Sequence, residues 1–308
     1  MGKWSTYPNF ITTSQYRSDD KEFFKTSKQL CFIDDAHFNI VQPRALIEKS
    51  VKWPPNYQIR IKFLDGDEWQ KAWVQKIVTE NISPVIDPSL SFTFVDKSEY
   101  ADVKISFKFD GYGASLIGTK CQEISQDKPT MQYGILDFPK SRKFEFDSKI
   151  YVIPDNVPET INHTGSVIKH EFGHVLGKHH EHQNPIDNPI VWNVEKTYKY
   201  YEEPPDPWTR DDIFNNILKM LKPSQVDATP FDPSSIMMYT IVPELTMNGF
   251  GFTKNDDYSK QDLKWLRYHV VGSEINYKKY FVITFAIIFT IALVYVFYKR
   301  FIIGRKKS

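Results

Sequence analysis

The chain has 308 residues and a formal net charge of +1, and 41% of its residues are hydrophobic and 15% aromatic. This length allows one large domain or two small ones, and the apolar content is enough for a sizeable core. The balanced charge, without a basic patch interleaved with aromatic residues, excludes nucleic acid as an expected partner. Because Cys31 and Cys121 are the only cysteines, a disulfide scaffold and a cysteine-based zinc finger are excluded. We expect two free, buried thiols, with a single disulfide between them as the alternative.

The first half of the chain predicts an extension followed by strands and helices. Residues 1–45 are polar without a sustained period, and we interpret them as an N-terminal extension or a short pro-segment. Apolar and polar residues alternate over residues 57–63, which predicts a half-buried strand, and the apolar spacing from Trp69 to Val78 predicts a helix. Further strands are predicted over three segments: residues 103–109, 111–119 and 129–136.

A histidine-rich stretch, HEFGHVLGKHH, occupies residues 170–180. His170 and His174 are four residues apart, so they lie on one face of a helix, which we expect to run from near Thr160 to Gly177. Neutral imidazole is the commonest protein ligand for zinc, and two rings on one helix face can converge on a single ion. The sequence therefore predicts a metal-binding helix in the middle of the chain.

The third metal ligand has to come from the residues after this helix. Gly177 can adopt the left-handed conformation that ends a helix, and the chain can then return towards the metal with His180. His179 and His182 are alternatives, but neither keeps the three-residue spacing from the glycine. Three histidines leave the fourth position of zinc open, as in a catalytic site, and Glu171, about 100° further round the helix, can reach a water there.

The second half predicts two more helices in an irregular arrangement. Residues 211–222 combine an acidic start, a basic end and one apolar face, which is typical of a helix. Ser259 and Asp262 have a spacing that resembles a capping box, so another helix is expected to begin there. We therefore expect an α+β fold of two lobes separated by a cleft, in which a twisted mixed sheet with helices precedes an irregular helical lobe.

The histidine stretch and a later methionine-containing turn together resemble one family of peptidases. HEFGHVLGKHH, followed by Glu181, resembles the extended zinc signature of the metzincin peptidases, and the sequence SIMMY of residues 235–239 resembles the Met-turn of their astacin-like branch. The chain departs from astacins proper in having Met238 where these usually have histidine. Further stretches resemble bacterial and fungal astacin-like catalytic domains in consistent order over roughly residues 46–272: KFLDG, ADVKISF, GASLIGT, PTMQYG, HEHQNP, FDPSSIMMY and YSKQDLKWL.

This resemblance implies the metzincin zinc-peptidase fold and a zinc-dependent endopeptidase that acts on a protein or peptide substrate. Glu171 is expected to be the general base for the attacking water, and Tyr239 is implied to stabilise the oxyanion, with a core tyrosine as the alternative. Met237 is expected to form a hydrophobic floor, and residues 113–119 an exposed edge strand that pairs with an extended substrate. One Zn²⁺ per chain is expected, on three ligands: His170, His174 and His180.

A second function stays open from the sequence. The chain is alternatively a catalytically silent zinc-binding protein of a membrane or virion envelope that uses a peptidase fold only for binding. Glu171 argues against this alternative, because a binding module has no need of a base beside the metal. A zinc assay combined with casein hydrolysis separates the two functions.

The C-terminal segment predicts a membrane anchor, because residues 280–298 are nineteen residues without a charge, long enough to cross a bilayer as a helix. We predict a single-pass membrane localisation through this span. The side of the membrane on which the peptidase domain lies stays open. The basic residues after the span predict that this domain lies outside the cell, whereas the lack of a signal peptide predicts that it lies in the cytoplasm. Gly2 also fits a loose myristoylation pattern.

Three domains are predicted in all. They are an N-terminal extension (residues 1–45), an astacin-like peptidase domain (residues 46–273), and an anchor with a short basic tail (residues 274–308).

Overall fold

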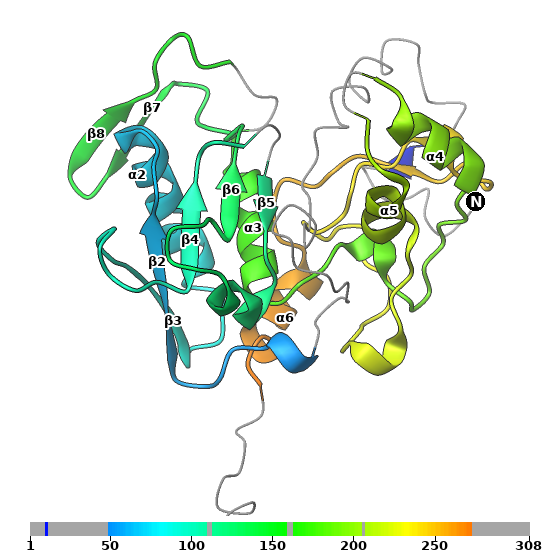
Figure 1. The fold of residues 1–308 in the computed structure, drawn as a ribbon, viewed down its shortest axis with the longest axis horizontal. Helices are drawn as coiled ribbons and strands as arrows, with labels where there is room; N and C mark the ends of the chain where they lie inside the picture. Colours follow the sequence, from blue (N-terminus) through cyan, green and yellow to red (C-terminus); the bar gives the residue numbers. More distant parts are fainter. Residues whose placement is uncertain (1–9, 12–48, 110–112, 159–162, 205–206, 273–308) are drawn as a thin grey trace, which may run out of the picture. The chain divides into compact units, whose positions relative to one another are not determined.

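The protein is described from a computed structural model of the 308-residue chain (Figure 1). The chain divides into two units, residues 1–272 and 273–308, and every described residue belongs to the first unit. The predictions made for Gly2, for Cys31 and for the segment 280–298 lie outside the described residues. The described ranges are residues 10–11, 49–109, 113–158, 163–204 and 207–272.

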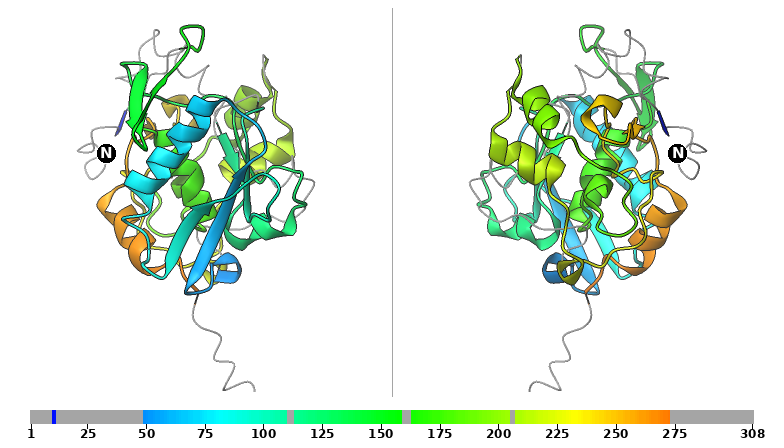
Figure 2. Two further views of the ribbon diagram at one scale, coloured as in Figure 1. Left: turned by 90° about the vertical axis from the view of Figure 1, so that its left-hand side faces the viewer. Right: turned by 90° about the vertical axis from the view of Figure 1, so that its right-hand side faces the viewer.

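A five-stranded mixed sheet is the framework of the described part (Figures 1 and 2). Its strand order is β3-β2-β4-β6-β5, in which β5 runs antiparallel to β6 at one edge and the other neighbours are parallel. The strands are β2 (Tyr57–Phe63), β3 (Leu90–Phe94), β4 (Val103–Ser106), β5 (Gly113–Ser115) and β6 (Met131–Tyr133). The strand predicted over residues 57–63 is confirmed, the three later predicted strands exist but are shorter, and β3 was not predicted.

The alternation in β2 directs Ile59 and Ile61 into the interior, where both side chains are fully buried. Helix α2 (Glu68–Ile77) follows, and Asp67 begins it through a capping box with Gln70. The helix continues into a π-helical turn over Val78–Ile82. The predicted helix is therefore confirmed, and its apolar face packs into the same core as the sheet.

Helix α3 (Ser166–Val175) carries the histidine stretch and shares the core of the sheet and α2. It is in contact with α2, and both helices can be followed in Figure 2. Phe172 of α3 meets Phe92 of β3 edge to face, with 5.4 Å between the ring centroids. Aromatic packing of this kind fixes the orientation of a helix on a sheet, so the histidines of α3 are held by a rigid framework.

A two-stranded hairpin lies beside α2 (Figure 1). It consists of β7 (Lys143–Phe146) and β8 (Lys149–Val152). Asp147 and Ser148 form its turn with positive φ angles of 49° and 59°, and the ring of Phe144 packs on Trp73 of α2 at 5.0 Å. This hairpin was not predicted, because its turn lacks the Asn-Gly or Asp-Gly pair that signals such a turn.

The second half of the described chain consists of short helices and irregular segments around three smaller cores. The helix predicted over residues 211–222 ends at Leu218, and the N–H of Leu221 bonds instead to the carbonyl of Gln183 at 3.1 Å. The capping box predicted at Ser259 is confirmed. The main helices of this half are α4 (Val194–Glu202), α5 (Arg210–Ile213), η6 (Phe214–Leu218) and α6 (Lys260–Tyr268). Its strand β9 (Gly251–Phe252) pairs with β1 (Phe10–Ile11) from the start of the chain.

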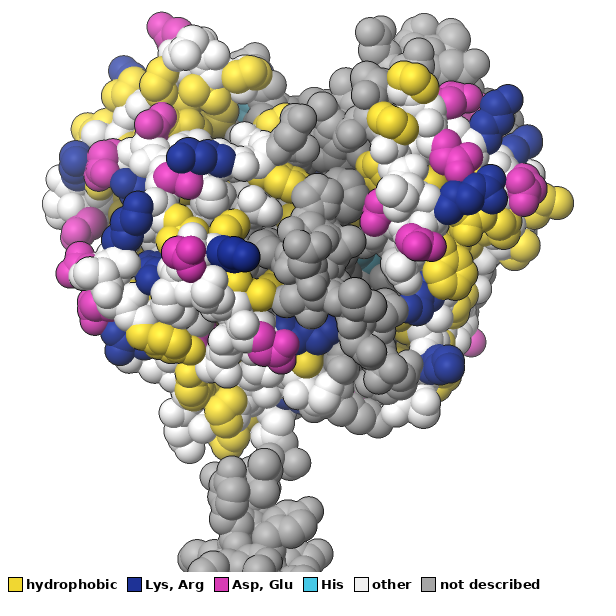
Figure 3. Space-filling view, viewed as in Figure 1, with side chains coloured by type: hydrophobic (Ala, Val, Ile, Leu, Met, Phe, Trp, Pro, Cys, Tyr) yellow, Lys and Arg dark blue, Asp and Glu magenta, His cyan; other side chains and the backbone are white. Residues whose placement is uncertain are grey.

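Charged side chains of both signs are mixed on the described surface that Figure 3 shows. Acidic and basic side chains lie next to one another over this face, and neither sign forms an area of its own there. The distribution agrees with the formal net charge of +1 for the whole chain.

The predicted membrane localisation has to be corrected. Among the described helices, none is long and apolar enough to cross a bilayer. The longest of them, α2 and α3, have ten residues each. Ten residues extend about 15 Å as a helix, which is half of the roughly 30 Å hydrocarbon core. The prediction of a single-pass membrane localisation is contradicted by the described helices, none of which could span a bilayer. The predicted transmembrane helix over residues 280–298 lies outside the described residues.

Candidate metal centre

Helix α3 begins at Ser166, not near residue 160 as we predicted. Gly165 precedes it with a left-handed φ of 72° and supplies no side-chain cap. The cap comes from Asp137, in the segment after β6, whose carboxylate accepts hydrogen bonds from the N–H groups of Ser166 at 2.7 Å and Val167 at 3.2 Å. A carboxylate at the positive end of a helix is favourable, so Asp137 determines where the helix that carries the histidines starts.

The C-terminal end of α3 agrees with the prediction that Gly177 ends the helix in a left-handed conformation. The helix ends at Val175, and Gly177 adopts the left-handed conformation with a φ of 91°. The N–H of Lys178 then bonds to the carbonyl of Gly173 at 2.8 Å, which closes the turn. This turn reverses the chain and brings His180 back towards the helix face that carries the first two histidines.

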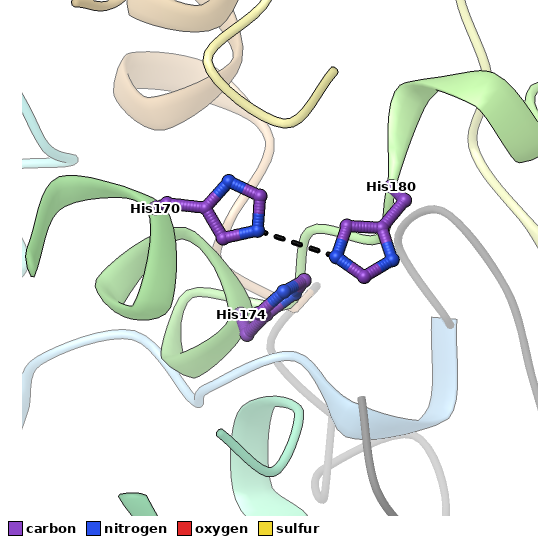
Figure 4. Close-up of side chains that lie close together, drawn as sticks. All are labelled: His170, His174 and His180. Carbon is purple, nitrogen blue, oxygen red and sulfur yellow. Dashed lines mark hydrogen bonds between the residues drawn. The ribbon is translucent and has the colours of Figure 1, made fainter. Parts of the chain in front are cut away.

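The structure brings together the three histidines named from the sequence (Figure 4). His170 and His174 project from α3, and His180 projects towards them from the segment after it. Their potential ligand atoms all lie within 4.8 Å of one another. The Nε2 atoms of His170 and His180 are 3.2 Å apart. Among the described residues, this is the one group of three or more histidine, cysteine or acidic side chains placed to hold a metal ion.

Backbone carbonyls fix the tautomers of two of these rings. Nδ1 of His170 lies 2.8 Å from the carbonyl oxygen of Ile236, and Nδ1 of His174 lies 2.6 Å from that of Lys178. Because a carbonyl oxygen only accepts, each Nδ1 carries the hydrogen and each Nε2 keeps its lone pair. Such an outer partner is what a metal-binding histidine requires.

Burial keeps the three rings neutral at physiological pH. Desolvation lowers the pKa of His170 to about 4, and it lowers the pKa values of His174 and His180 well below the ordinary value. The neutral ring is the form that donates a lone pair to a metal. Three neutral imidazoles with one open position match the donor set of a catalytic zinc site, so the residues present fit a zinc ion.

The two alternative ligands point elsewhere. Nε2 of His182 lies 2.8 Å from the carbonyl oxygen of Asn216, and its ring stacks on Tyr239 with 4.6 Å between centroids. His179 lines a separate pocket with Glu181. Neither His179 nor His182 joins the group of three, which agrees with the spacing argument from Gly177.

Glu171, which follows His170 on α3, is fully buried and touches the edge strand β5. A Cβ atom placed on Gly113 of β5 would lie 2.5 Å from Oε1 of Glu171. Both Glu171 and His170 line a pocket with an empty volume of about 440 Å³. The predicted base, one predicted ligand and an open space for a reacting group are therefore adjacent.

The segment of residues 235–239, which resembles a Met-turn, packs against α3 and supplies part of the pocket wall. Met237 is fully buried, and its Sδ would be 2.5 Å from a Cβ on Gly173, so the methionine packs directly against α3. Tyr239 lines the pocket, and its ring lies 4.0 Å from that of His180. Its side chain also belongs to one of the smaller cores. The tyrosine thus combines the position of a site residue with the packing of a core residue.

Two carboxylates near the site have roles that the sequence did not suggest. Asp137 was not singled out, and it caps a helix that begins 29 residues later, so no local spacing indicates it. Asp262 was predicted only as part of a helix cap. Its carboxylate also accepts from the N–H of Ile236 in the Met-turn at 2.8 Å. A signal for either contact would require the tertiary structure.

A comparison with solved structures supports a zinc-peptidase fold of mixed α/β type and, at a coarse level, a hydrolase acting on proteins or peptides. A structure of myroilysin aligns with a TM-score of 0.58 and 28% sequence identity, over 72% of this chain and 96% of that chain. A crystal structure of myroilysin aligns with a TM-score of 0.49 and 27% identity, over 77% and 89%. No protein-family model and no curated protein sequence matches the chain.

Proposed function

We propose that the protein is a zinc-dependent endopeptidase that hydrolyses peptide bonds in protein or peptide substrates. The observation that carries the proposal is the convergence of three histidines, whose potential ligand atoms lie within 4.8 Å of one another. The buried carboxylate of Glu171 follows His170 on α3, and these two residues line one pocket. The likeness to myroilysin, a metallopeptidase, supports the same class of reaction.

The proposed zinc ligands are His170, His174 and His180. Their neutral rings and the carbonyl partners of the first two supply the donor set that zinc requires. When bound, zinc would supply a Lewis acid that polarises the peptide carbonyl and makes a water more acidic. The protein's own contribution is to hold these rings in fixed positions before the metal arrives.

Glu171 is proposed as general base and then general acid. Its carboxylate would accept a proton from the water that attacks the peptide carbonyl, and would pass that proton to the amine nitrogen as the C–N bond breaks. The side chain follows His170 directly on α3 and packs against Gly113 of β5. A base held between a helix and a strand needs no reorganisation when the reaction begins.

Tyr239 is proposed to donate its hydroxyl hydrogen to the oxyanion that forms on the substrate. The proposal is supported by its place in the pocket wall and by the contact of its ring with His180. Met237 is proposed to have no chemical role. It fills the space beneath α3 and holds that helix at a fixed distance from the Met-turn.

Strand β5 is proposed to bind the substrate backbone. It is the edge strand of the sheet, next to Glu171, and it pairs on its inner side with β6. The three residues of β5 are buried in this structure, whereas we predicted an exposed edge. An extended peptide that adds to such an edge is held by main-chain hydrogen bonds, which do not depend on side chains. All of these residues fall within residues 46–273, which we propose as the catalytic domain.

The proposal is tested with the full chain and a Glu171→Gln variant, each analysed for bound zinc and for hydrolysis of casein. We expect the parent to bind one zinc and to cleave casein in a chelator-sensitive manner. The variant should retain zinc and lose cleavage. A parent that binds zinc and leaves casein intact would show a silent zinc-binding protein, and a variant as active as the parent would refute the role of Glu171.

A further inference from the structure

The carboxylate of Asp262 holds more than the helix that it caps. In the capping box of α6, the N–H of Asp262 bonds to Oγ of Ser259 at 2.9 Å, and Oδ2 of Asp262 accepts from the N–H of Ser259 at 3.0 Å. A capping box on the protein surface is complete with these two bonds. Asp262, however, is only 1% exposed, so its carboxylate needs further partners.

Those partners come from two other segments of the site. Oδ1 of Asp262 accepts from Oγ of Ser235 at 2.8 Å and from the ammonium group of Lys178, and Oδ2 accepts from the N–H of Ile236 at 2.8 Å. The ion pair with Lys178 is buried on both sides. A buried ion pair of this kind is retained only when hydrogen bonds satisfy the remaining lone pairs, and here they do.

Two of these partners are the residues that orient the histidines. The carbonyl of Ile236 accepts from Nδ1 of His170, and the carbonyl of Lys178 accepts from Nδ1 of His174. One carboxylate therefore fixes both residues whose carbonyls set the direction of two histidine rings. The link joins three segments of the chain, since Asp262 is 26 residues from Ile236 and 84 residues from Lys178.

We propose that Asp262 is a positioning residue of the metal centre, which acts through Ile236 and Lys178 to orient His170 and His174. A carboxylate is needed because its two oxygens both accept, whereas the amide of asparagine has a single acceptor oxygen. Partners of this outer kind typically affect metal affinity by about 10- to 100-fold. The inference depends on the proposed metal site, and its test uses metal binding rather than peptidase activity.

The test compares the full-length parent with Asp262→Asn and with Ser259→Ala as the matched control. Ser259→Ala removes the other half of the capping box, and the bonds of Asp262 to Ile236 and Lys178 stay in place. Zn²⁺ affinity is measured by competition with a chelator, the ligand field by the visible spectrum of the Co²⁺-loaded protein, and stability by thermal unfolding. We expect Asp262→Asn to bind Zn²⁺ about 10- to 100-fold more weakly with an altered Co²⁺ spectrum. Ser259→Ala should lose stability but keep the parental affinity and spectrum.

A second variant keeps the proposal testable if Asp262→Asn does not fold. Lys178→Met removes one of the two links and leaves Asp262 with three donors: Ser235, Ile236 and Ser259. We expect a smaller loss of Zn²⁺ affinity and again a changed Co²⁺ spectrum. Folded variants with parental affinity and spectrum overturn the inference, and so does an equal loss in Ser259→Ala. A parent that binds no Zn²⁺ would instead refute the proposed metal site itself.

Discussion

Gly113 in the edge strand β5 and Glu171 in helix α3 are in direct contact, since a Cβ on Gly113 would lie 2.5 Å from Oε1 of Glu171. Real Cβ atoms do not approach another heavy atom this closely, so the glycine is what allows the carboxylate to lie against the strand. At Gly113, the strand proposed to bind the substrate lies so close to the proposed base that no side chain fits between them. Gly272 offers a contrast, because a Cβ there would have its nearest neighbour at 3.6 Å.

We predict that Gly113→Ala displaces the carboxylate of Glu171 and lowers kcat/KM by at least about 10-fold, because a misplaced base is costly. Zinc content should not change, since the three atoms nearest to the new methyl group all belong to Glu171, which is not a proposed ligand. Gly272→Ala is the control and should keep parental activity. Casein hydrolysis and zinc analysis of both variants check the prediction, and a fully active Gly113→Ala would show that Glu171 can move without consequence.

Asp137→Ala should destabilise the protein through the start of α3. The variant leaves the N–H groups of Thr164, Ser166 and Val167 without their acceptor. The loss of a helix cap costs about 1 kcal/mol, and buried donors left unsatisfied add about 1–3 kcal/mol. We expect the free energy of unfolding in urea to fall by about 2–4 kcal/mol. The control is Asp155→Ala at a fully exposed position, and equal stability of the two variants would contradict the role of Asp137.

How far the sequence could predict this structure depends on the range of each interaction. The strand over residues 57–63 and the histidine spacing were predictable, because period and pitch are properties of neighbouring residues. The left-handed Gly177 was equally local. Asp137 and Asp262, by contrast, act on backbone groups at distances of 29 and 26 residues along the chain. Such contacts depend on where the sheet and α6 lie in the folded protein, so no local sequence pattern predicts them.

Two elements that the sequence did not predict correctly, the helix over residues 211–222 and the hairpin of β7 and β8, have separate physical causes. The helix predicted over residues 211–222 has the right apolar spacing, but the N–H of Leu221 finds its acceptor on Gln183 and the helix stops at Leu218. Tertiary contacts override local propensity here. The hairpin of β7 and β8 was missed because Asp147 and Ser148 adopt positive φ angles, which are unusual for these residues.

Zinc should stabilise the folded chain through the three proposed ligands. A metal that binds only the folded state adds about 3 kcal/mol when its free concentration is one hundred times the Kd. We therefore expect Zn²⁺ to raise the midpoint of thermal unfolding of the parent, and His174→Ala to abolish the increase. His179→Ala and His182→Ala should retain it. An increase that requires His182 and persists in His180→Ala would overturn the ligand assignment.

The thiol of Cys121 should be unreactive in the folded protein. Burial raises the pKa of this thiol to about 12, so only about one molecule in 10⁴ carries the reactive thiolate at pH 8. A Cys31→Ser variant isolates this thiol. We expect iodoacetamide to modify it slowly at pH 8, faster by about tenfold for each pH unit up to pH 10, and rapidly once the chain is unfolded in guanidinium. Rapid modification of the folded variant at pH 8 would contradict the buried position.

Tyr239→Phe should separate the hydroxyl of Tyr239 from the packing of its ring. Phenylalanine keeps the ring that lies 4.0 Å from His180 and 4.6 Å from His182, so we expect zinc affinity to be retained. Loss of one oxyanion donor lowers kcat by about 100-fold or more, with KM nearly unchanged, because the bond forms only in the transition state. Tyr201→Phe is the control, since Tyr201 belongs to the same small core but does not line the pocket. If both variants cleave casein at the parental rate, Tyr239 is a core residue, and the oxyanion must be stabilised without it.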